Sequence, residues 1–400
     1  MYDVGEIRGQ YPALADGRAW LDGAAGTQVP QTVIDAVADT YRAGVSNQGG
    51  PYESSRRAGS IVGAARQAVA DLVGAADPAG VVFGPNMTTV TYRFAATLAA
   101  GWQVGDEIVV TQLDHDANVR PWVQAAKKAG AVVRTAGVDP ETGALPAGNV
   151  TGLIGERTRL VAVTAASNLL GVRPDVRAIS ARAREVGALT YVDGVHHCPH
   201  EPVAVNELGA DFYATSVYKW SGPHIGCVVA DPGVLDGLAP DKLVPSPDTV
   251  PERFETGTAP FASLAGVTAA VEHLAGLDNE ATGSRRERLA LSRRSAAEHE
   301  QTLAAGMIDG LAAVAGVHRY GPSAGERTPT VLFGLRDRTP AEIAAKLAES
   351  GVNVSHGHSY AWEAVHALGL GASGAVRASL SHYSDESDVQ RLLDAVADLV

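Results

Sequence analysis

The chain has 400 residues, of which 46% are hydrophobic and 19% are charged, and its formal net charge is −13. This length and composition are typical of a folded protein with a sizeable core, and the length favours two domains or one large domain with a smaller companion. The acidic balance argues against nucleic acid or an anionic membrane as the main partner. Two cysteines are too few for a disulfide framework, no signal-peptide core opens the chain and no apolar run approaches the ~20 residues of a membrane helix, so we expect a cytoplasmic protein.

Short apolar runs alternate with alanine-rich helical patterns over the first two thirds of the chain. The expected strands are "GVVFG" (80–84), "DEIVVTQLD" (106–114), "AVVRTAGVD" (131–139), "TRLVAVTAAS" (158–167), "ALTYVDG" (188–194), "ADFYATS" (210–216) and "IGCVVAD" (225–231). Helical patterns cover 86–100, 117–130 and 175–187. This alternation predicts a mostly parallel sheet with helices on both faces.

The pattern changes near residue 276, where residues 278–314 read as one long polar-faced helix. Strand-like and helical segments then alternate, which predicts a small α+β unit. Its strands are expected at 328–335, 352–358 and 375–383, and its helices at 339–351 and 385–400. Thr339 and Ser384-Asp385 are expected helix starts. The proline-rich stretch 236–260 is expected to be irregular.

Two polar residues at the ends of expected strands suggest a catalytic pair. Asp193 ends "TYVD", and Lys219 follows "FYATS" within a stretch that is otherwise short of charge. Asp193 alone is as well explained by a helix cap. Because ligands of such sheets bind beyond the carboxyl ends of the strands, the two side chains are expected to converge there. An aspartate and a lysine together suit a pyridine cofactor, with the carboxylate on the ring nitrogen and the amine on the aldehyde.

An anion site is expected where "FGPN" turns into a helix. The free N–H groups at Asn86, Met87 and Thr88 and the positive end of the helix dipole suit a phosphate. The hydroxyls of Thr88 and Ser216 add donors. A simple capping role for Asn86 explains the same pattern equally well.

The motifs and their order resemble those of class V aminotransferases, which are fold type I pyridoxal phosphate enzymes, and among them the cysteine desulfurase-like members. The matching segments are "WLDGAAGTQVP" (20–30), "LDHDANVRPW" (113–122), "SNLLG" (167–171), "VDGVHH" (192–197), "SVYKW" (216–220), "RFETGTAP" (253–260) and "VRASLSHY" (376–383). The resemblance implies an α/β fold with a mostly parallel seven-stranded sheet. It divides the chain into an N-terminal segment (1–20) that packs with the small domain, a large cofactor domain (21–275) and a small α+β domain (276–400).

By this resemblance, Lys219 forms a Schiff base with pyridoxal 5′-phosphate and Asp193 keeps the ring nitrogen charged. His115 stacks on the ring, and Arg377 grips the substrate carboxylate. The remaining implied cofactor contacts are Asn86, Met87, Thr88, Asn168, His196, Ser216 and Tyr218. Thr258 is implied to reach the phosphate of a partner subunit, so we expect a homodimer whose small-molecule substrate is an amino acid.

The chain departs from the desulfurase pattern in "VNVSHGHSYAWEA" (352–364). Tyr360 takes the place of the mobile cysteine that accepts sulfur, and Ser355 stands where relatives carry an arginine. Cys198 and Cys227 lie outside this loop and are expected to be small buried residues. We therefore expect a C–S bond-cleaving enzyme without a persulfide cysteine, in which Tyr360 is a candidate acid or base. Transamination and epimerisation stay open, as does cofactor binding without turnover.

Several histidines raise further alternatives. "VHHCPHEP" (195–202) holds four potential metal ligands, but zinc sites usually draw on separate segments, so a metal site is disfavoured. His356 and His358 are expected to pack within their loop or to contact solvent. A nucleotide-binding protein is a remote alternative, because "LDGAAG" is a poor glycine-rich turn.

Overall fold

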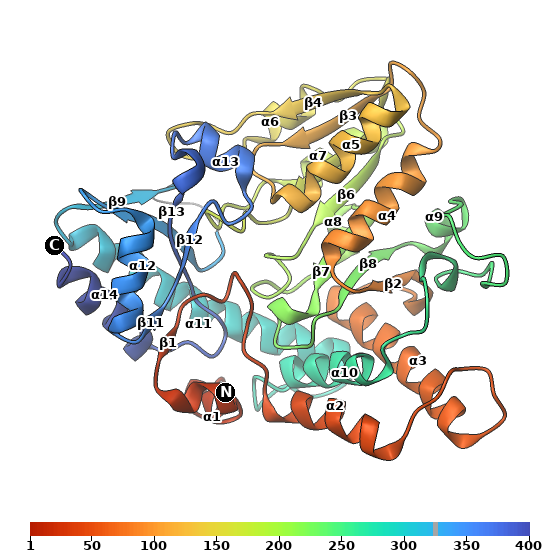
Figure 1. The fold of residues 1–400 in the computed structure, drawn as a ribbon, viewed down its shortest axis with the longest axis horizontal. Coiled ribbons are helices and arrows are strands. Elements are labelled where there is room, and N and C mark those ends of the chain that lie inside the picture. The colour runs from red at the N-terminus through yellow and green to blue at the C-terminus, as the bar shows by residue number, and fades with distance from the viewer. Residues whose placement is uncertain (323–326) are drawn as a thin grey trace.

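The computed structural model describes residues 1–322 and 327–400. A seven-stranded sheet forms the centre of its larger part, and the strand order is β2-β8-β7-β6-β5-β3-β4 (Figure 1). The strands are β2 (Val81–Gly84), β3 (Glu107–Thr111), β4 (Val132–Ala136), β5 (Thr158–Thr164), β6 (Leu189–Asp193), β7 (Phe212–Ser216) and β8 (Gly226–Ala230). β8 runs antiparallel to β2 and β7, and the other neighbouring pairs are parallel. The predicted seven-stranded, mostly parallel α/β sheet is confirmed.

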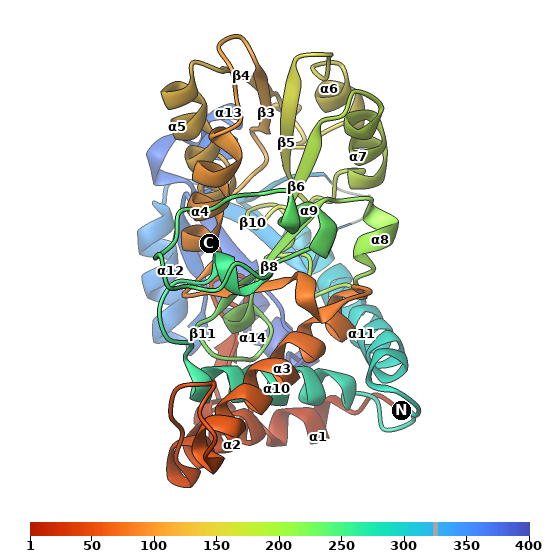
Figure 2. The same ribbon diagram turned by 90° about the vertical axis from the view of Figure 1, so that its right-hand side faces the viewer.

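Side chains alternate between the two faces of this sheet, and each face has its own core. In β5, Leu160 and Ala162 join one apolar cluster while Val161 and Val163 join the other. α4 and α5 cover the first face, and α3, α7 and α10 cover the second (Figure 2). Burial on both faces explains why these strands read as continuous apolar runs in the sequence.

Two helices of this larger part precede the sheet along the chain, and the others lie between its strands or after β8. In chain order, the helices are α2 (Gln31–Ala43), α3 (Glu53–Val73), α4 (Met87–Ala99), α5 (Arg120–Ala129), α6 (Ala147–Thr151), α7 (Val176–Glu185), α8 (Val205–Leu208), α9 (Pro232–Asp236) and α10 (Phe261–Ala275). Short 3₁₀ turns are η1 (Pro12–Asp16), η2 (Pro78–Gly80), η3 (Asp116–Asn118), η4 (Val217–Lys219) and η5 (Glu252–Phe254). Between α9 and α10, η5 is the one helical turn that the structure assigns, so the expected irregular stretch is confirmed.

The C-terminal part is an α+β unit around a four-stranded sheet of order β12-β13-β10-β9. Its elements are α11 (Arg285–Ala313), β9 (Val317–Tyr320), β10 (Thr330–Leu335), α12 (Pro340–Glu349), β11 (Val352–Asn353), β12 (Ser355–Gly357), α13 (Trp362–Ala367), η6 (Gly371–Ser373), β13 (Ala375–Ser379) and α14 (Glu386–Ala397). Thr339 and Asp385 cap α12 and α14 as predicted. The predicted start of the long helix at 278 is wrong, because a capping box of Ser284 and Glu287 begins α11 later.

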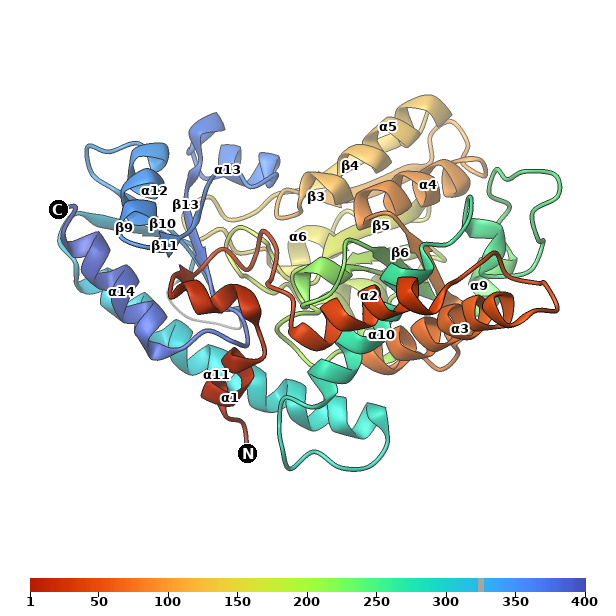
Figure 3. The same cartoon turned by 60° about the horizontal axis from the view of Figure 1, so that its bottom comes forward.

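The N-terminal segment lies against this C-terminal unit. It holds α1 (Val4–Gly9), which lies beside α11 in Figure 3, and β1 (Ala19–Trp20), which pairs in parallel with β11 (Figure 1). Arg8 of α1 forms ion pairs with Asp385 at 3.0 Å and with Asp388 at 2.6 Å. The packing of this segment on the C-terminal unit continues to Asp22, which bridges to Ser379, so the divisions at 20/21 and 275/276 stay predictions.

Within the described residues, no helix is both long enough and apolar enough to span a lipid bilayer.

Candidate active site

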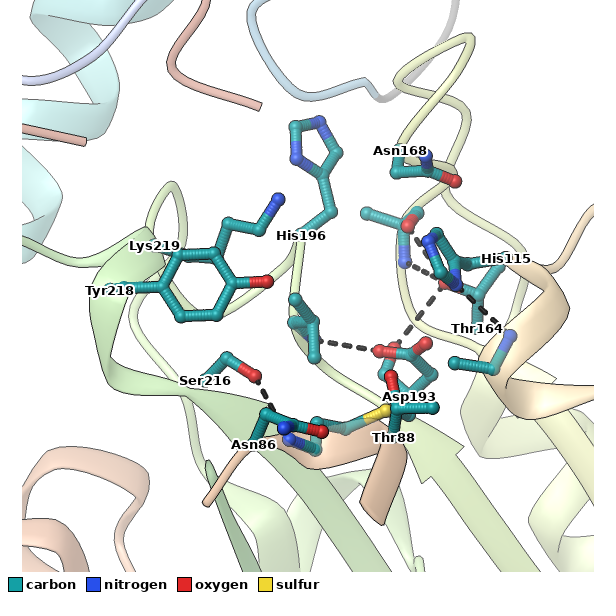
Figure 4. A pocket seen from close by; sticks show the side chains of 14 residues that line it. Asn86, Thr88, His115, Thr164, Asn168, Asp193, His196, Ser216, Tyr218 and Lys219 are labelled. Atoms are coloured by element: carbon teal, nitrogen blue, oxygen red, sulfur yellow. Dashed lines mark hydrogen bonds between the residues drawn. The ribbon is translucent and has the colours of Figure 1, made fainter. Parts of the chain in front are cut away.

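The carboxyl ends of the parallel strands gather the predicted polar residues at one edge of the sheet. Thr164 ends β5, Asp193 ends β6 and Ser216 ends β7, and Lys219 lies one short turn beyond β7. Figure 4 shows these side chains around one pocket. The neighbouring register of β6 and β7 therefore brings Asp193 and Lys219 to the same site, as the sequence predicts.

Lys219 has the electrostatics of a nucleophilic amine. Its Nζ donates to the backbone oxygen of Ala24 and lies 5.3 Å from the centroid of the Tyr218 ring. Burial, followed by the positive charge of Arg377, lowers the pKa of Lys219 to about 7, although Asp193 acts in the opposite direction. A large fraction of the amine is therefore neutral near pH 7, and the neutral form is the one that attacks an aldehyde.

Asp193 is a buried carboxylate with one oxygen to spare. Its Oδ1 accepts from the backbone N–H of Val195 at 2.9 Å, and no hydrogen bond joins Oδ2 to another described residue. Burial raises the pKa of Asp193 to about 6, while the Val195 N–H and Lys219 oppose that shift. The group is mostly ionised at pH 7, so Oδ2 suits the protonated nitrogen of a ligand ring.

The N-terminus of α4 forms the anion-binding side of the pocket. The Asn86 side chain accepts from the backbone N–H of Thr89 at 2.9 Å, which is the capping role considered from sequence. The Met87 N–H makes only a long contact, 3.4 Å, to Ser216 Oγ. Thr88 is exposed at the mouth of the pocket. The helix end therefore keeps donors that suit a phosphate.

Gly226 of β8 lets the α4 N-terminus lie against the sheet. A Cβ at this residue would lie 2.1 Å from the carbonyl carbon of Asn86 and 2.2 Å from the nitrogen of Met87. Since these are backbone atoms, the helix end itself would have to move. This close approach places the donors of α4 beside β7 and Lys219.

We expect Gly226→Ala to weaken binding of pyridoxal phosphate by roughly tenfold or more. Overpacking of this kind costs about 1–3 kcal/mol, and each 1.4 kcal/mol is a factor of ten in affinity. The dissociation constant of the cofactor, measured by absorbance titration of apoenzyme, checks this. Gly148→Ala is the control, because a Cβ at Gly148 has no atom within 4 Å. Unchanged affinity in a folded G226A variant would contradict the assigned role of the helix end.

Two histidines of the pocket are neutral. The backbone N–H of Ala117 donates to His115 Nδ1 at 3.0 Å, and burial followed by nearby positive charges lowers the pKa of His115 to about 3. Its proton is therefore on Nε2. His196 Nε2 lies 2.9 Å from the hydroxyl of Thr330, and burial holds the pKa of His196 well below its usual range. His196 thus joins the pocket to strand β10 of the C-terminal unit.

Arg377 reaches the site from β13. Its Nη1 donates to the backbone oxygen of Asn168 at 2.7 Å, and its Nη2 lies 3.3 Å from Ser355 Oγ. The Nε of Arg377 is buried and has no hydrogen-bond partner among the residues that the structure describes. Burial lowers the pKa of Arg377 to about 10, so the group stays charged at pH 7. A buried cation with an unused donor is suited to a substrate carboxylate.

The loop before α13 closes one side of the site. Asn168 Nδ2 donates to the backbone oxygen of Ser359 at 2.8 Å, and Asn168 Oδ1 is buried with no partner in the described part of the chain. The Tyr360 ring stacks on His115, with centroids 5.5 Å apart, yet 66% of the residue is exposed. Tyr360 therefore lies at the mouth of the pocket.

The site consists of a small inner pocket of about 50 Å³ and an open cavity of about 800 Å³ that share Lys219 and His115. Predicted residues that line one or both are Asn86, Met87, Thr88, His115, Asn168, Asp193, His196, Ser216, Tyr218, Lys219, Tyr360 and Arg377. Thr258 is not among them: it is exposed beside a separate cavity of about 590 Å³. The roles of all these residues stay predictions.

Sequence reasoning missed His224 and Thr164. The His224 ring stacks on Tyr218, with centroids 4.8 Å apart and planes 9° apart, and lines the outer cavity. Thr164 lines the inner pocket and donates to the backbone oxygen of Ala166 at 2.7 Å. His224 could have been found from its place directly after the Ser-Gly-Pro turn that follows Lys219. Thr164 could have been found as a hydroxyl residue at the end of an expected strand.

The histidines of "VHHCPHEP" have separate partners. His197 Nδ1 lies 3.0 Å from the Tyr213 hydroxyl, and His200 Nδ1 lies 2.9 Å from Glu300 Oε2. Among the described residues, no three His, Cys, Asp or Glu side chains are arranged to hold a metal ion.

The donor set fits pyridoxal phosphate on three counts. A lysine with a pKa of about 7 faces the pocket, a buried carboxylate has a free oxygen, and the N-terminus of α4 lines the same pocket. These features match the aldehyde, the ring nitrogen and the phosphate of that cofactor.

Comparisons with known proteins agree with this fit. The family model described as aminotransferase class-V matches residues 19–392. An uncharacterized protein of Mycobacterium tuberculosis (strain CDC 1551 / Oshkosh) is 37% identical over 100% of this chain and 99% of its own length. A probable cysteine desulfurase of Pseudomonas putida is 32% identical over 99% of this chain and 98% of its own. The crystal structure of the Escherichia coli cysteine desulfurase CsdA superposes with a TM-score of 0.87 at 27% identity, covering 100% of this chain and 98% of that one.

Proposed function

The chain belongs to the class V aminotransferase family of pyridoxal phosphate-dependent enzymes, and from this premise we propose that it cleaves the carbon–sulfur bond of a cysteine-type amino acid. The observation that carries the proposal is the convergence of Lys219, Asp193 and Arg377 on one site. A reactive amine, a free carboxylate oxygen and a spare guanidinium donor are what an amino acid and this cofactor need together.

The residues that would hold the cofactor each match one of its groups. Lys219 would bind the aldehyde, Asp193 the ring nitrogen, and His115 the ring face. Those that would hold its phosphate and remaining oxygen are Met87, Thr88, Ser216, Tyr218, Asn168 and His196. When bound, the cofactor supplies an electron sink for negative charge that develops at the substrate Cα.

The chain supplies the proton transfer and the orientation. Arg377 would bind the α-carboxylate through its unpartnered Nε and so fix the Cα–H bond relative to Lys219. The Lys219 amine, with its pKa near 7, would remove the proton from Cα and later donate it to a different atom. Asn168 would steady the Arg377 side chain, because its backbone oxygen accepts from Nη1.

Elimination is favoured over persulfide transfer because neither cysteine is accessible. Cys198 and Cys227 are both fully buried. Burial raises the pKa of Cys198 to about 11 and raises that of Cys227 further, so neither is a thiolate at pH 7. Sulfur would then leave the substrate directly, with Tyr360 at the mouth of the site as a candidate acid. An aminotransferase or an epimerase is the second candidate, since both begin with the same Cα deprotonation.

A homodimer belongs to the same proposal. Thr258 is exposed away from its own Lys219 pocket, as expected for a residue that reaches a partner's phosphate. Ile34 and Tyr41, one face of α2, are exposed apolar side chains, as are Tyr52 and Tyr92. The molar mass from light scattering checks this, and a monomer with full cofactor occupancy would contradict it. A cytoplasmic location also stays a prediction.

An amino-acid screen of the holoenzyme tests the reaction. We expect thiol or sulfide together with equimolar pyruvate from cysteine-type substrates, and neither pyridoxamine phosphate nor the D-amino acid. Keto acid with pyridoxamine phosphate would establish the aminotransferase, and formation of the D-amino acid without keto acid would establish the epimerase. An unchanged cofactor spectrum with every amino acid would indicate a binding protein without turnover.

A further inference from the structure

The outer cavity extends from the residues assigned to the cofactor to the loop before α13. Its volume is about 800 Å³, and the cofactor would occupy the part beside Lys219, His115 and Tyr218. A cysteine side chain is a single methylene and a sulfur. Beyond the residues assigned to the cofactor, the lining still holds the rings of Tyr92, His224, His356 and Tyr360. Such a lining favours a substrate whose side chain is large and planar.

Tyr360 is held in place by its backbone. Ser359 and Tyr360 both have left-handed conformations, with φ of 48° and 56°. Such φ angles cost conformational free energy for residues other than glycine, and they persist where surrounding contacts impose them. Here the Tyr360 oxygen accepts from the N–H of Asp116 at 2.7 Å, the Ser359 oxygen accepts from Asn168, and the Tyr360 N–H donates to His358 Nδ1 at 3.0 Å.

This backbone fixes the Tyr360 ring as a platform at the mouth. The ring stacks on His115 with planes 26° apart, and the His358 ring meets it edge-on at 5.6 Å. Two-thirds of the residue is nevertheless exposed, so the phenol still offers surface to a ligand in the cavity. Stacking of a second ring on such a surface contributes about 0.5–1.5 kcal/mol beyond area burial.

We propose that the substrate is an S-conjugate of cysteine whose sulfur carries a planar ring, and that Tyr360 selects it by stacking on that ring. This rests on the proposed C–S cleavage. With no accessible cysteine to take sulfur, the sulfur leaves with its substituent and needs a cavity large enough for both.

The step balances without an oxidant. The Cα proton passes to Lys219, the Cβ–S bond breaks with its electron pair on sulfur, and a double bond forms between Cα and Cβ. The sulfur takes up a proton and leaves as a thiol. The enamine product then reacts with water to give pyruvate and ammonium.

Calorimetry on the holoenzyme tests the selection. The probes are 3-(phenylthio)propanoate and 3-(cyclohexylthio)propanoate, which keep the carboxylate and the sulfur but lack the amine and cannot react. We expect the wild type to bind the planar probe about fivefold more tightly, Tyr360→Phe to keep this preference and Tyr360→Ala to lose it. Trp362→Ala is the control, since Trp362 is a partly exposed ring beside the same loop that does not line the cavity. Equal affinities in the wild type, or a preference kept in Y360A, would overturn the proposal.

Turnover separates this proposal from the one it rests on. S-phenyl-L-cysteine should give thiophenol and pyruvate in equal amounts, with a KM that rises in Y360A and stays unchanged in Tyr360→Phe, which keeps the ring. Turnover of L-cysteine with no preference for planar probes would overturn the selection by Tyr360 but leave C–S cleavage intact. Pyruvate from none of these substrates would overturn C–S cleavage itself.

Discussion

Replacing Lys219 by alanine is expected to lower kcat by about a thousandfold or more. A positioned acid–base group contributes about 10²–10⁴ in rate, and this amine is also the group that would fix the cofactor. Its pKa of about 7 results from burial and from Arg377, so no exposed lysine can replace it. Single-turnover absorbance changes with a cysteine-type substrate measure the loss directly.

A second measurement separates this role from a structural one. Borohydride treatment of the loaded wild type should add the mass of one cofactor to the peptide containing Lys219, whereas K219A should gain none. Lys127→Ala is the matched control, because Lys127 is exposed on α5 and far from the carboxyl edge of the sheet. Activity of K219A within tenfold of the wild type, or a cofactor fixed on another lysine, would refute the assignment.

Much of this site was predictable because the residue at which each strand ends can be identified from the neighbouring sequence. Once β6 and β7 are recognised as neighbouring parallel strands, Asp193 and Lys219 must meet at one edge. The capping residues Thr339 and Asp385 were equally predictable. Each is a residue whose side-chain oxygen accepts from the third helical N–H, and each is followed three residues later by an acidic residue.

The rest depended on contacts between distant segments. The sequence around Tyr360 does not predict its left-handed backbone conformation. Hydrogen bonds from Asp116 and Asn168, which lie far away in the chain, impose this conformation. The start of α11 was misplaced because charged residues continue the helical pattern upstream. There Asp278 instead donates its N–H to Ser292 Oγ and leaves Ser284 to cap the helix.

Asp193→Asn is expected to lower kcat by about a hundredfold or more while the cofactor still binds. The amide keeps the shape and can still accept the Val195 N–H, but it carries no charge to stabilise a protonated ring nitrogen. Electrostatic contacts aimed at a developing charge are worth about 10²–10³ in rate. Steady-state kinetics at saturating cofactor measure the effect, and Asp114→Asn is a comparison carboxylate, buried nearby but outside the pocket lining.

The pH dependence of cofactor uptake supplies the independent test of Asp193. Uptake needs Lys219 deprotonated, with a pKa of about 7, and Asp193 ionised, with a pKa of about 6. As the pH falls, the wild-type rate should therefore decline tenfold per unit below pH 7 and more steeply, approaching a hundredfold per unit, below pH 6. In D193N the second group is gone, so the slope should stay at tenfold per unit throughout. Identical slopes in the two proteins would show that the carboxylate does not govern binding, and the charge that it provides to the ring would have to come from elsewhere.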